Sequence, residues 1–220
     1  MAVNSLPVST SLRDEFDVAF PNRERTSDGT IGDAAHQKEV SDHNPDDTPG
    51  VRVGGSDSDH VAEVHARDVT SALNAPGWTM ARVTDIIRAR HKSGADARLL
   101  YIICDRRIAS VTSGWDWVAY SGSDPHQVHA HFSFRYGSGN GPANPENDTR
   151  PWGIVAAVTA AREEDDMATG ADVWNAEFGP ANGRETAGER LANVDSKIDT
   201  VASDLEQVKA DVAAILAKLK

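Results

Sequence analysis

The chain has 220 residues, of which 39% are hydrophobic and 25% charged, and its formal net charge is −12. This composition is that of a soluble globular protein, and the acidic balance excludes the basic face that non-specific nucleic-acid binding requires. No apolar run approaches the roughly 20 residues that span a bilayer, so we expect no membrane partner. The N-terminus lacks a basic segment followed by an apolar one, and therefore predicts no signal peptide.

The first 60 residues predict little regular structure. Residues 1 to about 27 are polar and mixed, with a short apolar patch that Pro21 ends. Asp33 is expected to cap a short helix over residues 34–37. Residues 44–60 are rich in Asp, Gly, Ser and Pro, so we expect a surface loop there.

Regular elements follow in the middle of the chain. Met80, Val83 and Ile87 have the spacing of an amphipathic helix. Cys104 is the one cysteine; it ends an apolar run and is expected to be a small core residue, since it has no disulfide partner. The expected elements are a strand in the second half of 61–70, a helix over 79–92, strands over 98–103 and 107–111, and a helix from 151 to about 162.

Three of the eight histidines fall within six consecutive positions, in the segment that ends at His131. Residues 129–135 alternate in side-chain type and predict a β-strand. Because residues two apart on a strand share a face, His129 and His131 point the same way, while Phe132 and Phe134 point into the core. Two imidazoles on one face favour a divalent metal; the alternative is a polar strand face that happens to carry histidines.

Two further residues can complete a metal site. His43 lies in a loop, and Asp68 lies on the predicted strand within residues 61–70. Two histidines and one carboxylate, with an open fourth position, are a known arrangement for catalytic zinc. The open position holds a water whose pKa falls towards 7, which gives hydroxide at neutral pH.

The residues at these positions carry a resemblance to a family. The chain resembles the zinc peptidases of the D-alanyl-D-alanine carboxypeptidase and L-alanyl-D-glutamate endopeptidase group, which share their fold with the hedgehog signalling domain, in Ser41-x-His43, Asp68-Val69-Thr70 and His129-x-His131-x-Ser133. More narrowly, it resembles endolysins of phages that infect actinobacteria in Asp28-Gly29-Thr30-Ile31-Gly32-Asp33-Ala34-Ala35-His36, Ser41-Asp42-His43-Asn44-Pro45 and Asp124-Pro125-His126. The similarity covers about residues 20–155, and the order of the motifs is more specific than any one of them.

The resemblance implies an α+β fold, with a small antiparallel sheet and flanking helices. It implies that His43, Asp68 and His131 bind Zn²⁺, and that His129 lies beside the metal-bound water. It further implies a zinc metallopeptidase that cleaves an amide bond in the stem peptide of bacterial peptidoglycan. Such a phage endolysin is made in the host cytoplasm and then released to the cell wall.

The chain departs from this family at two places. Many relatives have a glutamate general base shortly before the last histidine, but here Val128 and Pro125 stand three and six residues before His131. The candidates for the base are, in order, His129, Asp124 and His126, because a neutral imidazole is a competent base near pH 7.

The second departure concerns the first metal ligand. His43 lies further from Asp68 than is usual in the family, and Ser58-Asp59-His60 repeats the Ser-Asp-His triplet nearer to Asp68. His60 is therefore a rival to His43, which we prefer because its surrounding motif matches. His36 and His65 are expected to lie around the metal site or on the surface.

The C-terminal segment predicts a coiled coil. Its apolar residues follow one another in alternating steps of three and four over about four heptads: Leu191, Val194, Ile198, Val201, Leu205, Val208, Val212, Ile215 and Leu219. Mostly leucine at one seam position and β-branched residues at the other favour a trimer or tetramer through residues 191–219. The expected domains are a catalytic domain (1–160), a linker (161–187) and a coiled-coil oligomerisation helix (188–220).

An alternative function belongs to a different class. The chain would then be a phage structural or wall-binding protein, assembled by its coiled coil and holding a non-catalytic zinc. The two readings differ at the fourth coordination position, because a structural zinc is usually closed by four protein ligands.

Overall fold

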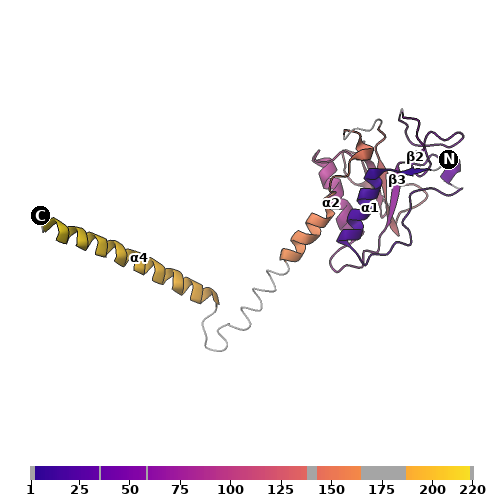
Figure 1. Cartoon of the computed structure of the whole chain (residues 1–220). Coiled ribbons are helices and arrows are strands. Elements are labelled where there is room, and N and C mark those ends of the chain that lie inside the picture. Colours follow the sequence, from indigo (N-terminus) through magenta and orange to yellow (C-terminus); the bar gives the residue numbers. More distant parts are fainter. Residues whose placement is uncertain (1–2, 35, 58, 138–142, 165–186, 219–220) are drawn as a thin grey trace. The chain divides into compact units, whose positions relative to one another are not determined.

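The structure is a computed structural model that describes residues 3–34, 36–57, 59–137, 143–164 and 187–218. The chain divides into two compact units, Met1–Thr159 and Ala160–Lys220, which are considered separately (Figure 1). The first unit is mixed α+β, as the sequence predicts. No helix in the described ranges is long and apolar enough to cross a membrane.

A five-stranded sheet with only antiparallel pairs organises the first unit. Its strand order is β3 (Ala66–Thr70), β7 (His129–Phe134), β4 (Leu99–Cys104), β5 (Arg107–Ser110) and β6 (Val118–Ala119). Asp105 and Arg106 join β4 to β5 with φ of 45° and 62°, and two consecutive residues with positive φ are what a two-residue hairpin turn requires. A separate parallel pair joins β1 (Asn4–Ser5) to β2 (Glu63–Val64).

Helices cover one face of the sheet, where α1 (Pro7–Ala19) and α2 (Met80–Lys92) lie on the same side (Figure 1). Phe132 and Phe134 of β7 are fully buried there, as predicted. Phe16 of α1 packs edge-on against Phe132, with ring centroids 6.0 Å apart. The histidine face of β7 is therefore turned away from this core, towards the loops of residues 29–60.

The expectation of an irregular N-terminal segment is wrong, because residues 7–19 form α1. Pro7 occupies the first turn, where its missing N–H costs nothing. Val8, Leu12 and Phe16 are fully buried and recur every four residues. This spacing is the signal for a helix whose other positions are polar. The short helix expected after Asp33 is a 3-10 turn, His36–Lys38.

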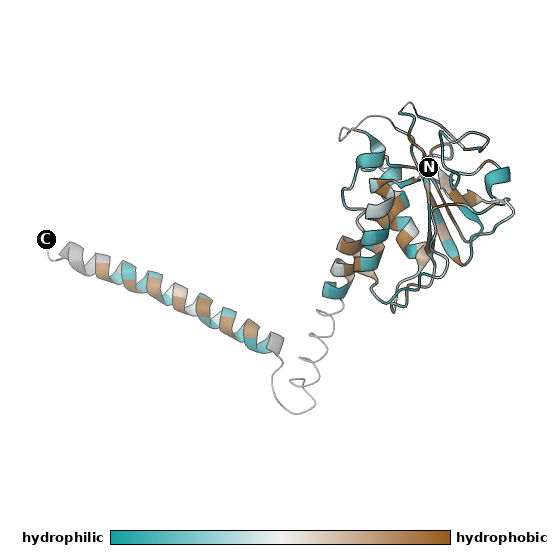
Figure 2. Cartoon of the chain, turned by 45° about the vertical axis from the view of Figure 1, so that its right-hand side comes forward, coloured by the Kyte–Doolittle hydropathy of each residue, from teal (hydrophilic) through white to brown (hydrophobic). Residues whose placement is uncertain are grey.

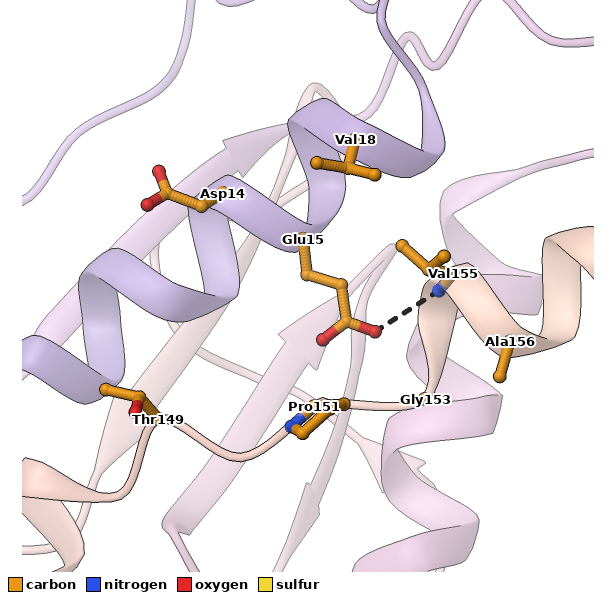
Figure 3. A pocket seen from close by; sticks show the side chains of 8 residues that line it. All are labelled: Asp14, Glu15, Val18, Thr149, Pro151, Gly153, Val155 and Ala156. Carbon is orange, nitrogen blue, oxygen red and sulfur yellow. Dashed lines mark hydrogen bonds between the residues drawn. The ribbon is translucent and has the colours of Figure 1, made fainter.

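Glu15 of α1 fixes the start of a helix that begins within the first unit and whose described part is residues 154–164. Its carboxylate accepts the backbone N–H groups of Trp152, Ile154 (2.7 Å) and Val155 (3.2 Å). Figure 3 shows the bond to Val155. A carboxylate at a helix N-terminus satisfies N–H groups that have no partner within the helix, and it complements the helix dipole. Residues 161–164, which the sequence assigns to a linker, continue this helix; the rest of the linker lies outside the described residues up to 186.

In the second unit, the described residues after 186 form one long helix, α4 (Ala187–Lys218). Hydrophobic residues recur along its length (Figure 2). The residues of the predicted heptad seam are exposed within this unit as far as they are described: Leu191, Val194, Ile198, Val201, Leu205, Val208 and Val212. Ile215 and Leu219 complete the sequence pattern, and their side chains lie outside the described set.

Candidate metal centre

Strand register brings Asp68 and His131 together. The two residues are direct partners across the antiparallel pair of β3 and β7, and partners of this kind have their Cβ atoms about 4.5–5.5 Å apart. Thr70 and His129 form the pair two positions along, so His129 and His131 share a face. Asp68 also pairs through its backbone with Gly29 on the other edge of β3 (N···O 2.8 and 3.2 Å).

His43 reaches this face from a loop. Residues 30–32, which directly follow Gly29, hold this loop in place. Nδ1 of His43 donates to the carbonyl of Thr30 (2.6 Å), and the carbonyl of His43 accepts the N–H of Gly32 (2.8 Å). A Cβ added to Gly32 would lie 2.6 Å from Cβ of His36 and 3.2 Å from Cβ of His43. Glycine is therefore required where the two histidine-bearing segments cross.

Three ligand-type atoms from these segments form a nearly equilateral triangle. Oδ1 of Asp68 lies 3.2 Å from Nε2 of His43 and 3.1 Å from Nδ1 of His131, and the two ring nitrogens are 3.1 Å apart. Zinc bonds of about 2.0–2.1 Å in a tetrahedron place neighbouring ligand atoms about 3.3–3.4 Å apart. The group could hold a metal ion, and its spacing fits three ligands of tetrahedral zinc with one position left for another group.

Protonation supports the same interpretation. A carbonyl can only accept, so Nδ1 of His43 carries its proton towards Thr30, and Nε2 of the neutral ring presents its lone pair to the triangle. Nε2 of His131 is buried and has no hydrogen-bond partner among the described residues. In the metal-free chain Nδ1 of His131 bonds to the carboxylate of Asp68 (3.1 Å), which only accepts, so a cation at the centre would replace the proton between them.

The pKa shifts of the metal-free chain follow from this crowding. Burial raises the pKa of Asp68, but the hydrogen bonds and charges of His131 and His43 outweigh it and lower the pKa overall. Burial lowers the pKa of His131, and the nearby His43 adds to this effect. Burial also lowers the pKa of His43, yet the hydrogen bond and charge of Asp68 outweigh it and raise the pKa. A bound cation would displace the proton that His43 and Asp68 otherwise share.

The three candidate bases lie beside this triangle. Nε2 of His129 is 3.7 Å from Oδ1 of Asp68 and 3.8 Å from Oδ2 of Asp124, and the His129 side chain is 12% exposed. The ring of His126 lies 4.8 Å from that of His129 and 5.5 Å from that of His131, between centroids. Nδ1 of His126 donates to the carbonyl of Asp124 (2.7 Å), so the ring is held by its own turn. Burial lowers the pKa of His126, and the proximity of His129 lowers it further.

The rival ligand His60 lies elsewhere. Its side chain is 87% exposed, and its Nδ1 lies 3.9 Å from Oδ1 of Asp47. His36 bonds to Asp33 (Nδ1···Oδ1 2.9 Å) and packs against the ring of His43. The structure thus brings His43, Asp68 and His131 together and leaves His60 outside this group.

Sequence reasoning missed Asp42, which anchors the loop that carries His43. Oδ2 of Asp42 accepts the hydroxyls of Ser133 (2.5 Å) and Tyr101 (2.7 Å), and Oδ1 accepts the hydroxyl of Tyr136 (2.9 Å). The only signal in the sequence was its position next to His43, since its three partners come from β4, β7 and the residues after β7. No family model, curated protein or solved structure matches this chain.

Proposed function

We propose that the chain is a zinc-dependent peptidase of the hedgehog/D,D-peptidase type, acting as a phage endolysin on the stem peptide of peptidoglycan. The observation that carries the proposal is the triangle of His43, Asp68 and His131, with ligand atoms 3.1–3.2 Å apart. Two imidazoles and one carboxylate form a three-ligand set of the kind found in catalytic zinc sites. The resemblance of the surrounding motifs supplies the substrate class.

In this proposal His43, Asp68 and His131 hold the ion. Zinc at such a site supplies Lewis acidity, which activates a water and polarises the amide carbonyl. Nε2 of His129 accepts the proton of the attacking water and returns it to the leaving amine. The carboxylate of Asp124, with Oδ2 3.8 Å from that nitrogen, stabilises the protonated ring by its charge. His126 stays neutral and limits the access of solvent to this side.

The test compares two histidine variants, His43→Ala and His60→Ala. Zinc is quantified per chain, and peptide release is measured from purified actinobacterial peptidoglycan before and after chelation. The unchanged chain and His60→Ala should hold about one zinc and release peptide. His43→Ala should lose zinc and more than about 100-fold in release, because even groups around a metal's ligands contribute 10–100-fold. Full activity in His43→Ala would remove the basis of the proposal.

A second candidate rests on one distance. Nε2 of His129, 3.7 Å from Oδ1 of Asp68, is close enough to become a fourth protein ligand, and four protein ligands are typical of a structural zinc. The chain would then be a phage structural or wall-binding protein. His129→Ala separates the two functions: a peptidase keeps its zinc and loses peptide release, whereas a structural site loses zinc affinity.

A further inference from the structure

A second group of ligand-type side chains surrounds His65, which lies between β2 and β3 and is fully buried. Its Nε2 is 3.1 Å from Oδ2 of Asp46, 3.9 Å from Oδ2 of Asp57 and 3.9 Å from Oε1 of Glu146. Ligand-type atoms of Asp57, Glu63, His65 and Glu146 all lie within 4.8 Å of one another. Four carboxylates thus meet at one imidazole, in a place where the sequence suggested no site.

The group has more negative charge than its surroundings neutralise. Among the described residues, no lysine or arginine lies within 4.0 Å of these four carboxylates. His65 is the group that can carry a positive charge within that distance. Burial, reinforced by the charge of Glu146, raises the pKa of Glu63 to about 7. Burial and the charge of Asp46 raise the pKa of Asp57 to about 6. The metal-free group therefore holds protons that a cation could replace.

Two oxygens of the group are buried without a hydrogen-bond partner among the described residues: Oδ2 of Asp57 and Oε2 of Glu63. The side chain of Asp57 is 2% exposed, and its unpartnered oxygen is the one that faces His65. Buried carboxylate oxygens without a partner are costly, so they point to a ligand that satisfies them.

The other two carboxylates are fixed by the backbone around them. Oδ1 of Asp46 accepts the N–H of Glu63 (2.8 Å), which leaves Oδ2 directed at His65. Glu146 accepts the N–H of Gly137 (2.6 Å) and the side-chain amide of Asn144 (2.9 Å). Hydrogen bonds from backbone and amide groups therefore fix the positions of these two carboxylates.

We propose that Asp46, Asp57, Glu63 and Glu146 bind a calcium ion beside His65. Carboxylate oxygens are the ligands that hard cations prefer, and calcium takes six to eight of them at 2.3–2.6 Å. Such bonds place neighbouring ligands about 3.3–3.7 Å apart and opposite ones about 5 Å apart. Ligand atoms of Asp57, Glu63 and Glu146 lie within 4.8 Å of one another, and one of Asp57 lies within 4.8 Å of one of Asp46, which is a spacing that this larger ion accepts more readily than tetrahedral zinc does.

Calcium at this place would order the approach to the metal centre. Asp46 stands three residues after His43 in the same loop. The ring of Tyr136 stacks on that of His65 with centroids 3.8 Å apart, and its hydroxyl donates to Asp42. The ion therefore joins the loop that carries His43 to β2, to the end of β7 and to the turn at Glu146. This inference does not depend on the metal centre being catalytic.

The test uses the full chain after its metals are removed. Calcium is titrated by calorimetry and by thermal unfolding. We expect about one calcium per chain, and a rise in Tm of about 5–10 °C at a hundredfold excess over Kd. Glu63→Gln and Asp57→Asn should lose this response. Because each removes one of several repelling charges, the metal-free variants should melt no lower than the unchanged chain, which separates lost binding from misfolding.

Two variants serve as controls. Glu39→Gln removes an exposed acidic side chain outside the group and should keep the full response. His43→Ala should lose zinc and keep calcium, so the two metal sites are tested independently. No change in Tm up to about 10 mM calcium, which exceeds the Kd of weak extracellular calcium sites, overturns the proposal. An equal response in Glu63→Gln, or a response to manganese or zinc and not to calcium, overturns it as well.

Discussion

At the scale of single residues, the candidate metal centre depends on groups that do not touch the metal position. Thr30 sets the proton of His43 through its carbonyl, and Asp42 gathers three hydroxyls behind the same loop. The grouping of His43, Asp68 and His131 could be expected from the resemblance of their motifs to those of the zinc peptidases. Thr30 and Asp42 could not, because an ordinary carbonyl and an ordinary aspartate become specific only through contacts between distant segments.

Asp42→Asn should lower the free energy of unfolding by about 2–4 kcal/mol, because hydrogen bonds to a charged group are worth about 1.5–3 kcal/mol each, and the amide has no charge and only one acceptor oxygen for the hydroxyls of Ser133, Tyr101 and Tyr136. Urea denaturation at neutral pH measures the change. Tyr101→Phe removes a single donor and should cost about 1 kcal/mol. Equal stability of Asp42→Asn and the unchanged chain would mean that the loop is held by other contacts.

At the scale of elements, strong hydrophobic periodicity in the sequence was enough to predict a strand or a helix, and weak periodicity was not. The strand of His129, the strand of Leu99 and the helix of Met80 are found within one or two residues of their predicted bounds. α1 was missed because its apolar positions are separated by polar and small residues. The loops over the histidine face contain Asp47 and His60 with φ of 42° and 63°, and no side-chain pattern specifies such conformations for residues other than glycine.

The cap that Glu15 provides is an element-scale contact that can be tested. Glu15→Ala leaves the N–H groups of Trp152, Ile154 and Val155 without their acceptor, and should cost about 2 kcal/mol, the upper range for a helix cap. Asp14→Ala is the matched control, since that neighbouring carboxylate pairs with Arg13 on the surface. Thermal unfolding compares the two, and a similar Tm for both variants would contradict the role of the cap.

At the scale of the whole molecule, α4 has an exposed apolar seam, against which the same helix of a second copy of the chain could pack. We propose a trimer or tetramer through this helix, and an assembly of this kind would raise avidity for a repetitive polymer such as peptidoglycan. The exposed seam residues support this, since apolar side chains in a heptad pattern are buried when helices associate.

Leu205→Lys should reduce the assembly to smaller species, because each helix loses about 1.5–3 kcal/mol of side-chain burial and gains a charge in the seam. Gln207→Lys adds the same charge two positions away, outside the seam, and should leave the assembly unchanged. Light scattering after size-exclusion chromatography gives the mass of each. A monomeric unchanged chain would rule out association through α4.

The strand order has a consequence for how the protein folds during its synthesis. β7, which carries His129 and His131, lies between β3 and β4, although it is made after both. Before β7 leaves the ribosome, β3 has no neighbour in the sheet and Asp68 has no His131 opposite it. Domains fold as units during synthesis, so here the sheet and the candidate metal centre must be completed together, late in translation. A nascent or prematurely ended chain therefore carries no finished centre.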